Sequence, residues 1–189
     1  MNIDTTTGML AEARQQPSPN YDERPAGTDI DLLVIHAISL PEGEFGGPWI
    51  DELFCNQLSA DAHPDFANIC GLKVSAHLLI RRDGEIIQYV PFHRRAWHAG
   101  ASQFQDREHC NDFSIGIEME GCDDQPFETI QYQRLAEVCA ALMQAYPGIT
   151  PERITGHNTI APERKTDPGP CFEWPTLYAL LRNEGLSLS

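Results

Sequence analysis

Two regions of the sequence carry side chains that can hold a metal ion. His36 ends a short apolar run, just before a stretch rich in glycine and proline. Residues 156–170 combine His157, Lys165 and Asp167 with several prolines. A catalytic zinc ion takes three protein ligands from histidine, carboxylate and cysteine side chains and leaves a fourth position open for water. Both regions are therefore candidates for such a site.

Each region also has a plainer explanation. A lone histidine is more often a hydrogen-bonded structural residue than a ligand, and the same holds for His63, His77, His93, His98 and His109. The charges of residues 156–170 are also compatible with a solvated surface loop, although prolines can stiffen a loop enough to hold ligands at fixed separations. Composition alone leaves both explanations open.

Short apolar runs predict the strands that position these residues. Residues 32–36 are apolar and rich in β-branched side chains, which predicts a buried strand. Residues 74–80 and 85–90 flank an Asp-Gly turn, which predicts a hairpin. Residues 113–120 alternate, so apolar side chains face the core and the other face carries Ser114, Gly116, Glu118 and Glu120.

Helices are expected at residues 49–58, 129–146 and 175–181, from their apolar spacing. Residues 91–112 are polar and irregular, which favours a functional loop that forms one wall of a cleft. The prolines of residues 156–170 exclude a regular helix or a central strand. The order of elements predicts an α/β (α+β) fold: a single domain over residues 1–189, with a core at about 17–183 and a mixed central β-sheet flanked by helices.

Charge and composition narrow the class of partner. The chain has 189 residues and a formal net charge of -15, which disfavours nucleic acid and anionic membranes. The N-terminal segment lacks a signal-peptide pattern, so we expect a soluble cytoplasmic monomer. The six cysteines form no CxxC pair, which favours reduced thiols over disulfides, and none has the context of a nucleophile.

Five motifs in order resemble one known family. They are LLVIHAISLPEGEFGG, VSAHLLIRRDGEIIQYVPF, RAWHAG, CNDFSIGIEMEG and GHNTIAPERKTDPGP. Together they are similar to the AmpD-type anhydro-muropeptide amidases, within the N-acetylmuramoyl-L-alanine amidase family that shares the peptidoglycan-recognition-protein fold. The resemblance runs from about Pro17 to Trp174. It implies hydrolysis of the amide between the muramyl lactyl group and L-alanine in 1,6-anhydro-N-acetylmuramyl peptides, during cell-wall recycling in the cytoplasm.

The resemblance also assigns roles to individual residues. It makes His36, His157 and Asp167 the ligands of one Zn²⁺ ion per chain. Glu118 matches the carboxylate that holds or deprotonates the attacking water, and Lys165 matches the lysine that stabilises the oxyanion. As an ordinary surface lysine, Lys165 would be dispensable for the rate.

Substrate contacts follow from the same resemblance. Trp97 matches an aromatic residue that faces the substrate, although a tryptophan can equally fill a core. His77 is expected near the cleft, and Arg107 could serve acidic groups of the peptide. Three positions depart from the family pattern, which has asparagine at Ala37 and arginine at Lys73 and His109. Because lysine and mostly neutral histidine cannot make the arginine fork, we expect weaker contacts with the stem peptide at these positions.

Two alternatives to this amidase compete with it. Some relatives of this fold bind muropeptides without cutting them, so a non-catalytic binding or sensing module is the main alternative. The presence of all three expected ligands together with Glu118 and Lys165 favours the enzyme. A cysteine hydrolase is disfavoured because no cysteine has a recognisable nucleophile context.

Overall fold

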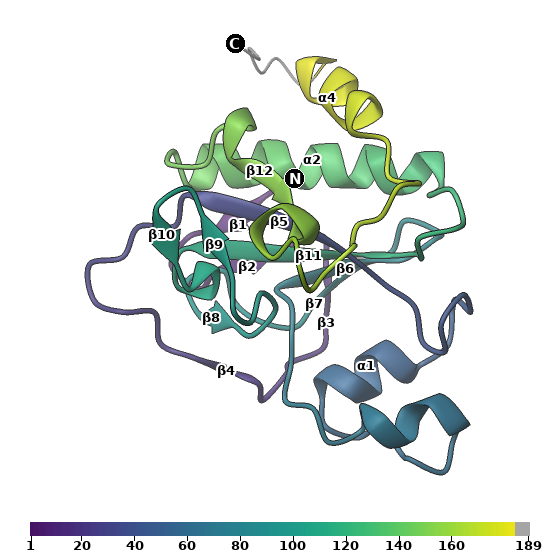
Figure 1. Cartoon of the computed structure of the whole chain (residues 1–189). Helices are drawn as coiled ribbons and strands as arrows, with labels where there is room; N and C mark the ends of the chain where they lie inside the picture. The colour runs from purple at the N-terminus through teal and green to yellow at the C-terminus, as the bar shows by residue number, and fades with distance from the viewer. Residues whose placement is uncertain (184–189) are drawn as a thin grey trace.

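The computed structural model describes residues 1–183, and residues 184–189, the end of the expected domain, lie outside the described part. A six-stranded mixed sheet forms its centre (Figure 1). The strands, in spatial order, are β12 (Ile154–Gly156), β5 (Leu32–Ile38), β11 (Ser114–Glu120), β6 (Leu78–Ile80), β7 (Ile86–Gln88) and β3 (Arg14–Gln15). The first four run parallel, and β7 is antiparallel to β6. The predicted fold class, a mixed sheet flanked by helices, is confirmed.

Helices α2 (Thr129–Ala145) and α4 (Trp174–Asn183) lie together over one face of the sheet (Figure 1). The main hydrophobic core lies beneath them, because alternate residues of each strand point to this side. From β11 these are Ile115, Ile117 and Met119, which pack in one cluster with buried residues of both helices. The predicted alternation of this strand is therefore confirmed.

The opposite face of the sheet is covered at its two ends. Helix α1 (Trp49–Phe54) and the 3-10 helix η1 (Pro64–Asn68) pack over β6 and β7. Residues 91–112 fold over the β5 and β11 end and contain short elements: β8 (Arg95–Ala96), β9 (Gln103–Phe104), β10 (Arg107–Glu108) and η2 (Cys110–Asp112). The polar side of β11 lies between these covers and is buried along its whole length. This polar strip is where the functional residues gather.

Several predicted elements differ from the structure in length. The predicted hairpin is present, but its first strand begins only at Leu78, because Ser75 bonds through its backbone N–H to the carbonyl of Trp97 instead of to a strand. Helix α1 ends at Phe54, four residues earlier than expected. Residues 156–170 begin with a one-turn helix, α3 (His157–Ile160), so the exclusion of helix there was wrong for its first residues. A 3-10 helix, η3 (Pro151–Arg153), precedes β12.

The N-terminal segment belongs to the core, which corrects the expected core boundary near residue 17. A hairpin of β1 (Ile3–Asp4) and β2 (Met9–Leu10) leads into β3, which pairs with β7. Leu10 is fully buried in the main core cluster. The side chain of Gln88 accepts a hydrogen bond from the Leu10 N–H at 2.8 Å and donates to the Gly8 carbonyl at 2.9 Å. A further two-stranded sheet joins β4 (Tyr21–Asp22) to β8.

Two further features concern the cysteines and the length of the helices. All six cysteines are free thiols, as expected. Among residues 1–183, no helix combines the length and the apolar character needed to cross a bilayer.

Candidate functional site

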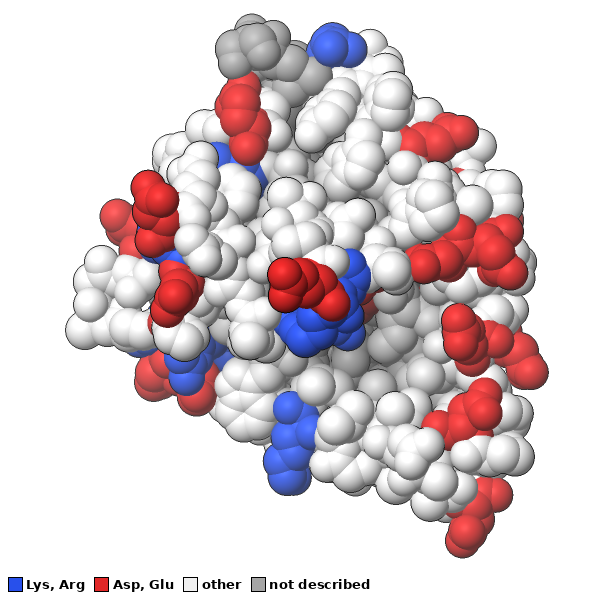
Figure 2. Space-filling model, in the orientation of Figure 1, with Lys and Arg blue, Asp and Glu red and all other residues white. Residues whose placement is uncertain are grey.

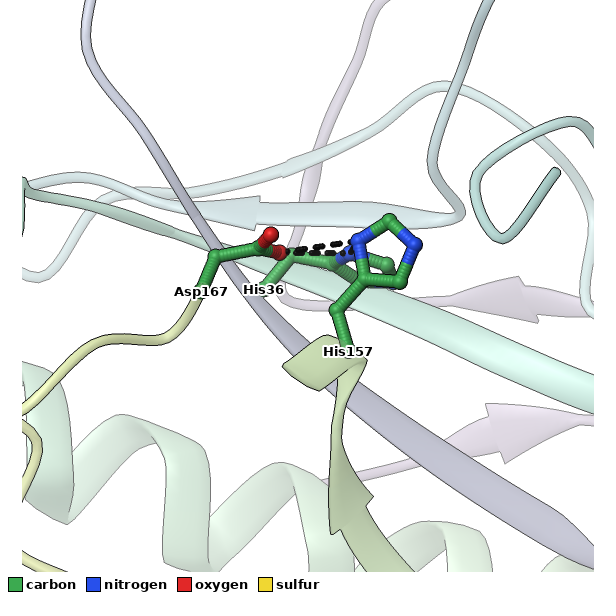
Figure 3. A group of neighbouring side chains, drawn as sticks. All are labelled: His36, His157 and Asp167. Atoms are coloured by element: carbon green, nitrogen blue, oxygen red, sulfur yellow. Dashed lines mark hydrogen bonds and ion pairs between the residues drawn. The ribbon is translucent and has the colours of Figure 1, made fainter. Parts of the chain in front are cut away.

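Three candidate ligands meet beyond the carboxyl ends of two neighbouring strands. His36 lies near the end of β5, and His157 follows directly after β12. Because Gly156 pairs in register with Ile35, the two histidines leave the sheet side by side. Asp167 comes from the loop after α3, and the three side chains point toward one another (Figure 3).

The three inner atoms form a compact triangle. Nδ1 of His36 lies 2.9 Å from Nδ1 of His157, and Oδ2 of Asp167 lies 3.1 Å and 3.0 Å from these nitrogens. Both histidines are buried, and the carboxylate is partly exposed. The set is open to solvent only on the side of Asp167.

The hydrogen bonds on the outer side of His157 show why a cation fits this triangle. Nε2 of His157 lies 3.1 Å from the carbonyl oxygen of Ala99, which can only accept, so this nitrogen carries the proton. The lone pair of its Nδ1 therefore faces the Asp167 carboxylate. Two acceptors at 3.0 Å repel each other unless a positive charge lies between them. The residues present thus fit a divalent metal ion, for which imidazole and carboxylate are suitable ligands.

The pKa values of His36 and Asp167 both lie below their ordinary values. Burial lowers the pKa of His36 to about 4, so the imidazole is neutral near pH 7. Burial alone would raise the pKa of Asp167, but the two neighbouring imidazoles outweigh it and hold this pKa below its ordinary value. Near pH 7 the site therefore contains a neutral His36 and an ionised Asp167.

Glu118 lies beside the triangle on the polar side of β11. It pairs in register with His36 and is only 8% exposed. Its Oε2 is buried and has no hydrogen-bond partner within residues 1–183. Burial raises its pKa well above the ordinary value, the negative charge of Asp167 adds to this effect, and the positive charge of Lys165 opposes it. A carboxyl group whose pKa is raised in this way can serve as a general base and then as a general acid.

Lys165 lies on the exposed loop between α3 and Asp167. It lines a cleft of about 520 Å³ together with Asp167, Ala37, the loop at residues 38–42 and residues 121–123. Acidic side chains are spread over the face of the molecule seen in Figure 2, and a basic patch lies near its middle, with further basic side chains at the top and on the left. The cleft thus offers a positive charge and a metal site at one place on an otherwise acidic protein.

A second hollow lies on the other side of Arg164, which lines both. Its walls are residues 101–103 and 160–164 together with Glu108 and His109. The guanidinium group of Arg164 donates to the carbonyl oxygens of Ala99 and Ala101 at 2.7 and 2.8 Å. Arg164 therefore ties the loop that carries Lys165 and Asp167 to residues 91–112, which form a wall of this hollow as expected.

The expected substrate residues are found in different environments. Ala37 lines the cleft beside Asp167, and His109 lines the neighbouring hollow. Lys73 is exposed and Trp97 is partly exposed. Arg107 pairs with Asp31 at 2.7 Å and lies over the Phe113 ring at 3.7 Å. It is engaged with the protein itself.

His77 corrects one expectation. Its side chain has no exposed surface, and its ring accepts from the Gly116 N–H at 3.0 Å and lies 3.0 Å from the Arg94 carbonyl. A ring enclosed in this way cannot touch a bound substrate. The resemblance placed His77 near the cleft, but its ring is enclosed and bonded to the main chain of Gly116 and Arg94.

Two residues near the metal triangle were missed. His98 is partly exposed, and its Nδ1 lies 2.9 Å from Nε2 of His36. Arg164 joins the two hollows. His98 is part of the RAWHAG motif, but a single histidine there has no spacing that distinguishes a site residue from a structural one.

Comparisons with known proteins agree with this geometry. The model of the N-acetylmuramoyl-L-alanine amidase family matches residues 26–170. The 1,6-anhydro-N-acetylmuramyl-L-alanine amidase AmpD of Salmonella typhimurium strain SL1344 is 61% identical over 174 residues, covering 92% of each chain. A crystal structure of a selenomethionine derivative of AmpD is 60% identical, with a TM-score of 0.92 over 96% of this chain and 99% of that one.

A solved complex of a more distant amidase is also similar. It is AmiD of E. coli with the substrate anhydro-N-acetylmuramic acid-L-Ala-D-gamma-Glu-L-Lys, at 29% identity and a TM-score of 0.60. It covers 89% of this chain and 67% of the other. The family match spans most of the present chain and includes the metal triangle, Glu118 and Lys165. The chain therefore belongs to the N-acetylmuramoyl-L-alanine amidase family.

Proposed function

We propose that this protein is a zinc-dependent amidase that cuts the bond between 1,6-anhydro-N-acetylmuramic acid and L-alanine in muropeptides. The observation that carries the proposal is the triangle of His36, His157 and Asp167 with the unpartnered Glu118 carboxyl group beside it. The activity in the names of the similar AmpD proteins supports the choice of substrate. One Zn²⁺ ion per chain, a monomeric state and a place in cytoplasmic peptidoglycan recycling are parts of the same proposal.

The metal ligands and Glu118 have complementary tasks. A zinc ion held by two imidazoles and one carboxylate supplies a Lewis acid and lowers the pKa of a bound water to about 7. Glu118 lies on the adjacent strand in register with His36, so its carboxylate can receive the proton of the attacking water at Oε2. The same carboxyl group then returns the proton to the leaving nitrogen of L-alanine.

Lys165 stabilises the negative charge that develops on the substrate. Its ammonium group lines the same cleft as Asp167, where the carbonyl oxygen of the substrate becomes negative during attack. A fixed positive charge at that position favours the transition state over the neutral ground state. Its exposure is compatible with this role because a bound substrate would cover it.

The two hollows on either side of Arg164 suit a ligand with a sugar at one end and a short peptide at the other. The AmiD complex shows that a relative of this fold binds a sugar joined to a short peptide. In this chain Ala37 lies in one cleft and His109 in the other, so we assign these positions, with Lys73 and Trp97, to contacts along the muropeptide. Arg107 would join them only after leaving its partner Asp31.

A single assay tests the proposal against the alternative of a non-catalytic binding module. Purified protein is incubated with anhydromuramyl-tripeptide, with and without a chelator, and the products are analysed by mass spectrometry. We expect free tripeptide and anhydro-N-acetylmuramic acid, lost with chelator and restored by zinc. A Glu118→Gln variant should bind the substrate but release little product. Binding by the wild type without cleavage would show a binding module instead.

A further inference from the structure

We propose that His98 is a positioning residue for the metal ligand His36. It accepts the Nε2 proton of His36 and thereby fixes the tautomer that presents the Nδ1 lone pair to the metal. The inference rests on the metal site of the proposed function. It adds a residue to which no metal-binding or catalytic role was assigned by the sequence motifs.

A chain of hydrogen bonds runs from Cys110 through Ser114 and His98 to His36, and its direction is set at Cys110. The carbonyl oxygen of Cys110 can only accept, so the Ser114 hydroxyl donates to it at 2.6 Å. The Ser114 oxygen, 3.3 Å from Nε2 of His98, is then left to accept, and this nitrogen carries the proton. Nδ1 of His98 is therefore an acceptor. It lies 2.9 Å from Nε2 of His36, which must donate.

Each ligand histidine thus has its own outer acceptor from adjacent positions of one segment. The His98 ring serves His36, and the carbonyl oxygen of Ala99 serves His157. The side-chain oxygen of Asn111 accepts from the backbone N–H groups of both residues, at 3.1 and 2.8 Å. One asparagine therefore holds in place the segment that sets both tautomers.

The ring of His98 lies directly against the sheet. It packs against the Cα of Gly116 on the polar side of β11, where an added Cβ would come within 2.4 Å of the ring. The rings of His98 and His36 meet edge to face, with centroids 5.0 Å apart. Because no main-chain rearrangement is needed to make the contact, the fold supplies a preorganised second partner for the ligand.

Removing this partner should weaken metal binding without unfolding the protein. Outer partners of ligating histidines typically change metal affinity by about 10- to 100-fold when they are lost. His98→Phe keeps a ring of similar shape without an acceptor, whereas His98→Asn places an amide oxygen close to the position of Nδ1. Ser114→Ala leaves His98 in place but frees its tautomer, so its effect should be smaller than that of His98→Phe.

The test measures zinc affinity by competition with a chelating indicator, and thermal unfolding of the zinc-free protein. We expect a loss of about 10- to 100-fold in His98→Phe and partial recovery in His98→Asn. The control is His77→Phe at a fully buried histidine that bonds to Gly116, Arg94 and Arg24 and to no metal ligand, so it should lower thermal stability but leave zinc affinity unchanged. Equal zinc affinity in folded His98→Phe and the wild type would overturn the inference.

A second measurement remains informative if His98→Phe fails to fold. Long-range proton–nitrogen NMR of the zinc-free wild type reports the tautomer of each ring, and we expect the proton of His36 and of His98 on Nε2. A proton on Nδ1 of His36 would overturn the inference whatever the zinc affinity. Failure of the wild type to bind zinc, with the expected tautomers present, would instead refute the proposed function.

Discussion

Replacing Asp167 by asparagine should shift metal binding and metal-free stability in opposite directions. The change preserves the size of the side chain and removes its charge. Zinc sites with four ligands gain about 10–16 kcal/mol on binding, so one ligand accounts for about 3–4 kcal/mol. We therefore expect zinc affinity to fall by about two to three orders of magnitude.

In the metal-free protein the same change should be stabilising. Oδ2 of Asp167 can only accept, and it lies 3.0 Å from the lone pair of Nδ1 of His157 and 3.1 Å from Nδ1 of His36. The new amide can instead donate N–H groups to these nitrogens. Each such neutral hydrogen bond contributes about 0.5–1.5 kcal/mol, so the free energy of unfolding should rise by about 1 kcal/mol.

The two effects are measured separately. Zinc affinity is obtained by competition with a chelating indicator, and metal-free stability by urea unfolding in the presence of EDTA. Asp123→Asn is the matched control, because Asp123 lines the same cleft without contacting either histidine, and it should change neither quantity. A metal-free Asp167→Asn variant less stable than the wild type would refute the reasoning, since the carboxylate would then be an ordinary hydrogen-bond partner.

Three further predictions concern catalysis, specificity and pH. Lys165→Met should retain zinc and lower kcat by about 10²- to 10³-fold. Wild-type turnover of this variant in a product assay would show that Lys165 is an ordinary surface lysine. Restoring arginine at Lys73 and His109 together should lower KM for a tripeptide stem and leave it unchanged for a one-residue stem, at about 1 kcal/mol per contact; equal effects on both would show that these positions do not contact the peptide. Burial lowers the pKa of His77 to about 3, so between pH 6.5 and 3 only the unfolded chain takes up this proton. The free energy of unfolding should therefore decrease as the pH is lowered through that window. The slope from this group is at most about 1.4 kcal/mol per pH unit, and urea curves of His77→Gln should show a flatter dependence.

The sequence predicts the elements whose pattern is local. The alternation of β11 and the apolar spacing of α2 identify both elements because each face contacts one environment along its length. Alternation cannot show what covers the polar side. In the structure residues 91–112 lie over part of this side, and Glu118 on it is buried, which raises its pKa.

The site itself depends on contacts between distant parts of the chain. His36 meets His157 across 121 residues and Asp167 across 131, separations that no local spacing encodes. The resemblance to a family supplied this trio, whereas His98 has no pattern of its own. The N-terminal strands were missed for a related reason, because β3 is two residues long and pairs with residues that follow it by more than seventy positions.

The strand β3 protects one edge of the sheet. An unpaired edge presents a row of main-chain donors and acceptors that invites other chains to pair with it. Here β3 and the residues after it occupy that edge, with Gln16 and Ser18 donating to the carbonyls of Gln88 and Tyr89. A chain shortened to begin at residue 17 would expose this edge and remove the two partners of the buried Gln88 amide at Leu10 and Gly8. Such a chain should retain its metal ligands and still self-associate, a failure of solubility rather than of catalysis.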